Sequence, residues 1–182
     1  MVQALPNVPA SALSSYVNNF PATSMTIGTN WIPMPGSSTQ GLYWYVAVDL
    51  TNLNVVQNLV STDPTSVPPA IQALAGNSRY FLFFISNWQP SYNIPTGALY
   101  QFLLAIGAGP GLISGEQMIE QLGTGYITHF SYVLAASLSA NNVPGFEVFS
   151  EVHFEVLTMQ FMPVTVDGQT TYAPVSIGGL QP

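Results

Sequence analysis

The sequence predicts an α+β fold: a mostly antiparallel, β-sandwich-like core with three or four short helices, an N-terminal arm and a C-terminal hairpin. Two observations predict it. Short β-branched and aromatic runs alternate with turn residues, as in antiparallel sheets. Several short segments also carry the start and stop signals of helices. Because 182 residues suffice for one core domain, we assign residues 1–40 to the arm, 41–163 to the core and 164–182 to the hairpin and tail.

The N-terminal arm is predicted to contain a short helix and one extended segment. Pro9 suits the first turn of a helix, and Pro21 stops it. Ser24–Met34 alternates apolar and polar residues and predicts a strand, and Pro33–Gln40 predicts a linker. The apolar residues that recur at helical spacing before Pro21 are Leu13, Tyr16, Val17 and Phe20.

The first half of the core predicts a hairpin, a helix and a buried strand. Leu42–Leu50 and Val55–Val60 are strand-like, and the polar segment Thr51–Asn54 between them predicts their turn. Ser66–Gly76 predicts a short helix, because prolines open it and a glycine closes it. Tyr80–Ser86 is a continuous apolar run, which is typical of a strand covered on both faces.

Two helices are predicted next. Thr96 is a candidate cap for a helix over Gly97–Ile106, which Gly107 ends. A second helix is predicted over Gly115–Leu122, where Ser114 with Gln117 has the spacing of a capping box.

Strands return in the last third of the chain. His129–Ala136 and Val148–Phe161 are strand-like, and a shift of the alternation inside Val148–Phe161 predicts a bulge or burial on both faces. Asp167-Gly168, followed by Gln169–Tyr172, predicts a tight β-hairpin. The order of all elements, β-β-α-β-α-α-β-β, favours helices packed against sheets.

The charge content excludes several classes of partner. Only 5% of the residues are charged, against about 25% in ordinary globular domains. The net charge is −7, there is no lysine, and Arg79 is the single arginine. Nucleic acid and anionic membrane surfaces are therefore excluded as partners, because both need several basic side chains. The chain has no cysteine, no apolar stretch near the ~20 residues of a membrane-spanning helix, and no recognisable signal peptide.

The near absence of charge also predicts self-association. A surface of uncharged polar groups resists association poorly, so we expect a homo-oligomer in which the terminal segments grip neighbouring subunits. With Arg79 as its single site for trypsin, and with 15 prolines, the chain also suits an extracellular life. Our first hypothesis is a non-catalytic, self-assembling structural or interaction protein of an extracellular particle, fibre or appendage.

Aromatic and amide side chains give the candidate ligand or interface residues. Trp88, Gln89, Tyr92 and Asn93 gather in one polar loop, a composition that suits sugar stacking as well as protein contact. The second hypothesis is accordingly a lectin-like module that binds a glycan, and the third is a secreted toxin or signalling factor that binds a host-surface protein. Core packing of Trp88 stays an open alternative. The two further candidates are Trp31 and Arg79, and for Arg79 a structural ion pair is the alternative.

A metal or catalytic centre has weak support. Glu151, His153 and Glu155 would share one face of a strand, where they could ligate a metal or form a solvated polar face. They would span about 13 Å, too far to converge on one ion without a bulge or the help of His129 from another strand. The serine-hydrolase motif Gly-x-Ser-x-Gly and a lysine-bearing phosphate loop are both missing. We therefore expect no enzyme activity, no cofactor and no metal.

A family resemblance adds to this interpretation. Three segments carry the resemblance: GLYWYVAVDLTNLNVVQNLV, RYFLFFISNWQPSYNIPTGALYQFLLAIGAG and EQLGTGYITHFSYVLAASLSANNVPGFEVFS. In the order of its elements, residues 41–163 resemble the interleukin-like EMT inducer domain, also called the PANDER-like or GG domain. The resemblance implies a compact β-sandwich with helices and no catalytic centre, in a family of secreted factors and lectin-like modules. Family members are disulfide-bonded, whereas this chain has no cysteine.

Overall fold

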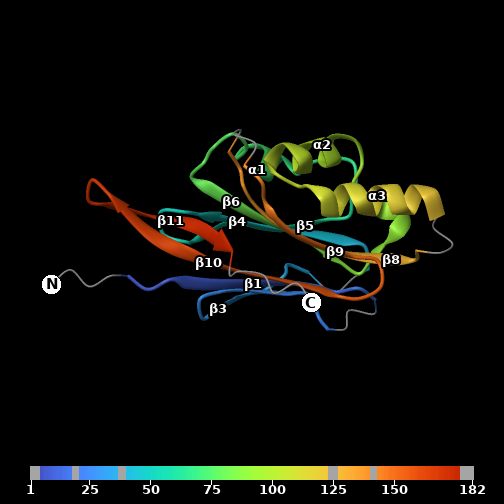
Figure 1. The fold of residues 1–182 in the computed structure, drawn as a ribbon, viewed down its shortest axis with the longest axis horizontal. Helices are drawn as coiled ribbons and strands as arrows, with labels where there is room; N and C mark the ends of the chain where they lie inside the picture. The colour runs from blue at the N-terminus through green and yellow to red at the C-terminus, as the bar shows by residue number, and fades with distance from the viewer. Residues whose placement is uncertain (1–4, 18–20, 37–39, 123–126, 140–142, 177–182) are drawn as a thin grey trace.

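The computed structural model describes residues 5–17, 21–36, 40–122, 127–139 and 143–176. These residues form two open sheets whose strand pairs are antiparallel, together with three α-helices (Figure 1). The fold is therefore β-rich, as the sequence predicts. None of the helices in this part of the chain has the length and apolar character needed to cross a membrane.

The five-stranded sheet joins the two ends of the chain. Its order is β11-β10-β1-β2-β3, so an N-terminal strand pairs with one that lies nearly 150 residues later. The predicted arm thus contributes three strands to a sheet of its own chain. The strands are β1 (Val8–Ser14), β2 (Ser24–Ile27), β3 (Asn30–Ile32), β10 (Glu155–Val166) and β11 (Gln169–Ser176).

The predicted N-terminal helix is wrong, because β1 occupies that segment. Ala10 and Ala12 point into the interior and alternate with less buried residues. β1 also has a strand partner on each side, β10 and β2. This pairing outweighs the helical spacing of the apolar residues around Leu13. The predicted strand Ser24–Met34 is in fact the short hairpin of β2 and β3, with Gly28 at positive φ in its turn.

The six-stranded sheet forms the middle of the fold. Its order is β5-β4-β6-β8, and both β7 and β9 pair with β8. The predicted hairpin is confirmed in β4 and β5, and the predicted buried strand is confirmed in β6. The strands are β4 (Leu42–Asp49), β5 (Val55–Ser61), β6 (Tyr80–Asn87), β7 (Gln89–Pro90), β8 (His129–Ser137) and β9 (Phe146–Ser150).

The helices cover one face of the six-stranded sheet, at the top of Figure 1. They are α1 (Pro69–Gln72), α2 (Gly97–Ile106) and α3 (Pro110–Leu122), so the predicted bounds of α2 are confirmed. The capping box predicted at Ser114 is wrong, because α3 already begins at Pro110. Its first turn is instead held from outside: Glu147 on β9 accepts hydrogen bonds from the backbone N–H groups of Gly109 and Gly111.

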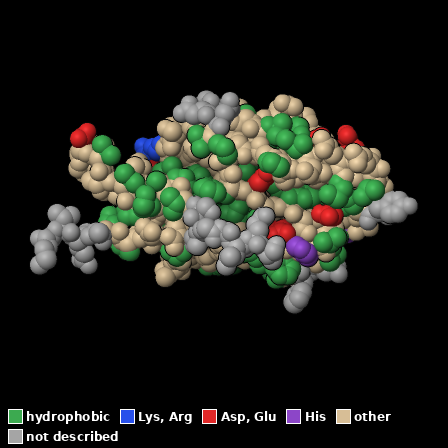
Figure 2. All heavy atoms as spheres, viewed as in Figure 1, with side chains coloured by type: hydrophobic (Ala, Val, Ile, Leu, Met, Phe, Trp, Pro, Cys, Tyr) green, Lys and Arg blue, Asp and Glu red, His purple; other side chains and the backbone are tan. Residues whose placement is uncertain are grey.

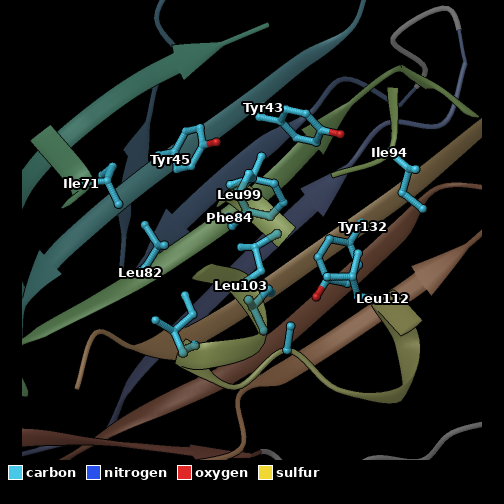
Figure 3. Packing of buried hydrophobic residues seen from close by; sticks show 14 of the residues in the cluster. Tyr43, Tyr45, Ile71, Leu82, Phe84, Ile94, Leu99, Leu103, Leu112 and Tyr132 are labelled. Carbon is cyan, nitrogen blue, oxygen red and sulfur yellow. The ribbon is translucent and has the colours of Figure 1, made fainter. Parts of the chain in front are cut away.

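The six-stranded sheet contributes to two apolar clusters, one on each face. Tyr43, Tyr45, Leu82 and Phe84 pack against helical residues such as Leu103, as Figure 3 shows. The other face packs against the five-stranded sheet. That second cluster joins Trp44, Val46, Phe81, Phe83 and Ile85 to Ala10, Ala12, Met25, Ile27, Leu157, Met159 and Phe161. Burial of both faces accounts for the continuous apolar run of β6.

The chain passes from one sheet to the other between β9 and β10. The predicted strand Val148–Phe161 is wrong as one element, since β9 ends at Ser150 and β10 begins at Glu155. Ser150 Oγ accepts hydrogen bonds from the N–H groups of Val152 and His153 (3.2 and 3.3 Å), which fixes this bend.

The predicted C-terminal hairpin is confirmed in β10 and β11. Asp167 and Gly168 both have positive φ (50° and 78°), as a tight two-residue turn requires. In Figure 1 this hairpin extends beyond the end of the six-stranded sheet. Residues 37–39 of the predicted linker and 177–182 of the predicted tail lie outside the described residues.

Candidate functional site

The loop after β6 brings together four of the residues selected from the sequence. Trp88 separates β6 from β7 and has positive φ (48°), which turns the chain sharply. The N–H of Trp88 donates to the carbonyl of Ser15, and its own carbonyl accepts from the N–H of Gly41. The loop is thus held by the residue that follows β1 and by the residue that precedes β4.

Amide groups hold the rest of this loop together. Asn93 Nδ2 donates to Gln89 Oε1 (2.8 Å), and the hydroxyl of Tyr43 donates to the carbonyl of Asn93. Gln89 is buried, whereas Tyr92, in a 3₁₀ turn over Ser91–Asn93, is 77% exposed. Of the four loop residues, Tyr92 is therefore the one that presents its ring to solvent.

His129, which the sequence did not assign to this loop, completes it. Its ring stacks on Trp88 with 6.4 Å between ring centroids and an interplanar angle of 27°. Its Nε2 lies 3.1 Å from Gln40 Nε2. Burial lowers the pKa of His129, which favours the neutral imidazole near neutral pH. The loop is therefore an uncharged aromatic and amide surface.

Buried polar atoms without hydrogen-bond partners concentrate at this loop. Within the described ranges there are five such side-chain atoms, and the one elsewhere is the hydroxyl of Tyr45. Internal water is the usual partner of such groups in proteins. Because solvent does not reach these atoms, a ligand in solution would not reach them either while the loop keeps this conformation. The four atoms at the loop are Ser15 Oγ, Trp88 Nε1, Gln89 Nε2 and Ser91 Oγ.

Arg79 has a structural partner. Its Nε donates to Asp49 Oδ2 (2.9 Å), and its Nη2 forms a second short contact with the same oxygen. Asp49 also accepts hydrogen bonds from the N–H and the hydroxyl of Thr51. The guanidinium of Arg79 holds the pKa of Asp49 well below its usual range. The single arginine therefore joins the end of β4 to the start of β6.

Trp31 lies on β3, at one edge of the five-stranded sheet, whereas the loop of Trp88–Asn93 (the Trp88 loop) follows β6 of the six-stranded sheet. It is 65% exposed and belongs to the face of this sheet that points away from the six-stranded sheet, which we call the outer face. The strand register places Thr26 opposite Trp31, and Ser11 opposite both Thr26 and Thr158. By alternation along the strands, the part of the outer face on β10, β1, β2 and β3 comprises Pro9, Ser11, Leu13, Ser24, Thr26, Trp31, Val156, Thr158, Gln160 and Met162.

The outer face carries no charged side chain. The five strands of its sheet contain a single charged residue, Glu155, whose alternation places it with the inward-pointing Leu157 and Met159. Figure 2 shows that uncharged and apolar side chains also dominate the side of the molecule seen there. Polar hydroxyl and amide groups therefore provide most of the hydrogen-bonding capacity of the outer face.

The predicted alignment of Glu151, His153 and Glu155 along one strand is wrong, because Glu151 and His153 lie in the bend before β10. His153 Nδ1 lies 3.4 Å from Glu155 Oε1. No group of three metal-ligating side chains occurs in the part of the chain that the structure describes. The bend thus gives these residues a different geometry from the one that the alternation predicted.

A groove of about 510 Å³ lies between α3, β9 and this bend. Sequence reasoning missed it, because its walls come from segments separated by some 30 residues. Glu147 is its anchored carboxylate: one oxygen caps α3 and the other accepts from the hydroxyl of Tyr132 (2.8 Å). Its lining residues are Pro110, Gly111, Ser114, Met118, Glu147, Val148, Phe149, Glu151 and Glu155.

Comparisons with known proteins leave the family open. No protein-family model matches the chain, and no curated protein matches it at a significant level. The resemblance of residues 41–163 to the interleukin-like EMT inducer domain therefore stays a prediction.

Proposed function

We propose that this chain is a non-catalytic, self-assembling structural or interaction protein, built on a β-sandwich-like pair of sheets, whose copies join through the outer face. The observation that carries the proposal is the absence of charge on that face, across β10, β1, β2 and β3. A solvated sheet face ordinarily carries charged side chains, because they cost nothing there and keep the protein monomeric.

The distribution of charge supports a second copy of this chain as the partner. Each copy has eight acidic residues and one arginine, and that arginine already binds Asp49. Two copies that met through their acidic surfaces would repel each other with no basic side chain to compensate. The outer face is a surface on which two copies meet without this repulsion.

The side chains of the outer face also suit an interface. Trp31, Val156 and Met162 are large apolar side chains that are exposed on it. Tryptophan often dominates the binding energy of protein interfaces, and tryptophan and methionine are both enriched there. The surrounding serine, threonine and glutamine side chains supply hydrogen bonds for a polar rim. A particle, fibre or appendage outside the cell is the setting that such an assembly favours.

The surroundings of the histidines support a non-catalytic role. A hydrolytic triad needs a histidine between a nucleophile and an acid. His129 contacts Gln40 and the hydroxyl of Thr128, with no acid among its described contacts. The imidazole of His153 contacts Glu155 and the carbonyl of Phe154, and among the described contacts the serine hydroxyls near His153 reach its backbone and not its ring. Neither arrangement supports acid–base catalysis.

A lectin-like role for the Trp88 loop has less support than self-assembly. Tyr92 offers an exposed ring for stacking, but the polar atoms of Trp88, Gln89 and Ser91 are shielded from solvent. The alternative of a secreted factor that binds a host-surface protein gains no specific support from the geometry.

A charge introduced on the outer face tests self-assembly. Sedimentation of the full chain over a wide concentration range should show reversible association. Thr158→Glu places an acid on the outer face, opposite Ser11 of β1, and we expect it to raise the dissociation constant at least tenfold, because like charges then meet at the interface. Gln101→Glu on the exposed side of α2 adds the same charge and should leave association unchanged. A wild-type monomer at all concentrations, or equal effects of the two variants, would refute the proposal.

A further inference from the structure

The groove beside α3 follows an open strand edge. Glu147, Val148 and Phe149 are consecutive residues of β9, and all three line it. Because neighbouring side chains of a strand point to opposite faces, a groove that touches three in succession runs along the edge of the strand. Among the described strands β9 pairs with β8 alone, so its other edge has no strand partner. Such an edge is a template for an added strand.

The groove also has the apolar walls that an extended peptide needs. Met118 of α3 lines the groove together with Val148 and Phe149 of β9. Pro110, the first residue of α3, adds a further apolar side chain to the lining. Apolar surface continues in the bend that borders the groove, where Val152 is 65% and Phe154 44% exposed. Alternate side chains of an added strand would contact these walls, which is how strand addition obtains its specificity.

The charge of the groove selects a basic partner. Glu147 is satisfied by Tyr132 and by the first turn of α3, whereas Glu151 and Glu155 have no lysine or arginine beside them among the described residues, and His153 Nδ1 lies 3.4 Å from Glu155 Oε1. Burial raises the pKa of the Glu155 carboxyl; His153 opposes this rise and Glu151 adds to it. A cation in the groove would stabilise both carboxylates.

This cation does not come from a second copy of the chain. There is no lysine in the sequence, and Arg79 is bound to Asp49 on a different part of the fold. A second copy would bring further acids to a groove that already holds three. The occupant that fits both the open edge and the charge is therefore a basic segment of another protein.

We propose that the groove docks an extended segment of another protein, which adds as a strand along the free edge of β9 and places a lysine or arginine against Glu151 and Glu155. This interaction is separate from self-assembly, which uses the opposite side of the five-stranded sheet. It gives an assembled particle a second surface, one that recruits a different protein.

Peptide binding to the full chain tests the proposal. The probe is a short fluorescent peptide that alternates lysine and valine, and its anisotropy reports binding. We expect saturable binding that weakens at least tenfold in the double variant Glu151→Gln/Glu155→Gln. The matched control is Glu116→Gln/Glu120→Gln, which removes two charges from α3 outside the groove and should leave binding unchanged.

Two altered peptides test the geometry. A peptide with glutamate in place of lysine should not bind, and one with N-methylated backbone amides should lose binding, because it no longer pairs with the strand edge. Absence of binding, equal loss in the two double variants, or undiminished binding of the methylated peptide would overturn the proposal. So would a groove variant that abolishes self-association instead, since the occupant would then be a second copy; loss of self-association in Thr158→Glu alone leaves the groove unaffected.

Discussion

The two sheets differ in how many of their faces are covered. The six-stranded sheet lies between the helices and the five-stranded sheet, and every residue of β4 is buried. The five-stranded sheet packs on one side only, so buried residues alternate with exposed or half-buried ones along β10 from Val156 to Met162. The number of covered faces thus determines whether a strand is continuously apolar or alternating in sequence.

The same comparison separates two reasons for the absence of charge. Inside the six-stranded sheet, burial makes an unpaired charge costly, so Asp49 occurs together with Arg79. On the outer face, burial imposes no such cost, and yet no charged side chain is present. Folding therefore accounts for the scarcity of charge in the six-stranded sheet but not for its absence from the outer face, where we propose an interface.

The largest difference between the sheets should appear when the same residue type is truncated in each. Trp44 of β4 is fully buried and donates a hydrogen bond to Asn58 Oδ1 (2.7 Å). We expect Trp44→Ala to reduce the free energy of unfolding by about 3–5 kcal/mol, because it leaves a cavity between the sheets. Urea unfolding followed by circular dichroism measures this loss. A loss below about 1 kcal/mol would mean that the two sheets do not share a packed core.

An intermediate effect should come from the charge that the six-stranded sheet does bury. Asp49→Asn keeps the shape of the side chain and removes its charge, so we expect a loss of about 1–2 kcal/mol at neutral pH; the half-exposed guanidinium of Arg79 limits the value. Because folding lowers the pKa of Asp49, its contribution is fully present above the unfolded value of about 4 and disappears as the pH falls below it.

The acid side of the stability profile is the measurement for this pair. The wild type should lose stability between about pH 5 and 2, and Asp49→Asn should lose less over the same interval. Parallel pH profiles for the two proteins would show that Asp49 is not stabilised by Arg79. Both the wild type and Asp49→Asn should keep some loss of stability at acid pH from Asp63, since hydrogen bonds from Ser66 and Thr65 lower the pKa of Asp63 to about 2.

Secondary-structure elements that depend on residues close together in the sequence were predictable. The apolar run of β6, the turn between β4 and β5 and the Asp167-Gly168 hairpin each depend on neighbouring residues, and each was predicted correctly. Elements that depend on contacts between residues far apart in the sequence were not. β1 is a strand because β10 pairs with it, and α3 starts early because Glu147 caps it from β9. At the site, sequence composition selected the Trp88 loop, but the groove needs three separate segments to meet and has no local signal.

The smallest effect on stability should come from the exposed tryptophan. Trp31 lies on a three-residue edge strand with most of its side chain in solvent, so we expect Trp31→Ala to change the free energy of unfolding by no more than about 0.5 kcal/mol. The same variant should weaken self-association in sedimentation, because the ring belongs to the outer face. The unfolding has to be measured at low protein concentration, since association itself stabilises the folded state. A loss above about 1 kcal/mol under those conditions would place Trp31 in the fold rather than in an interface, and the outer face would then lose its strongest candidate contact.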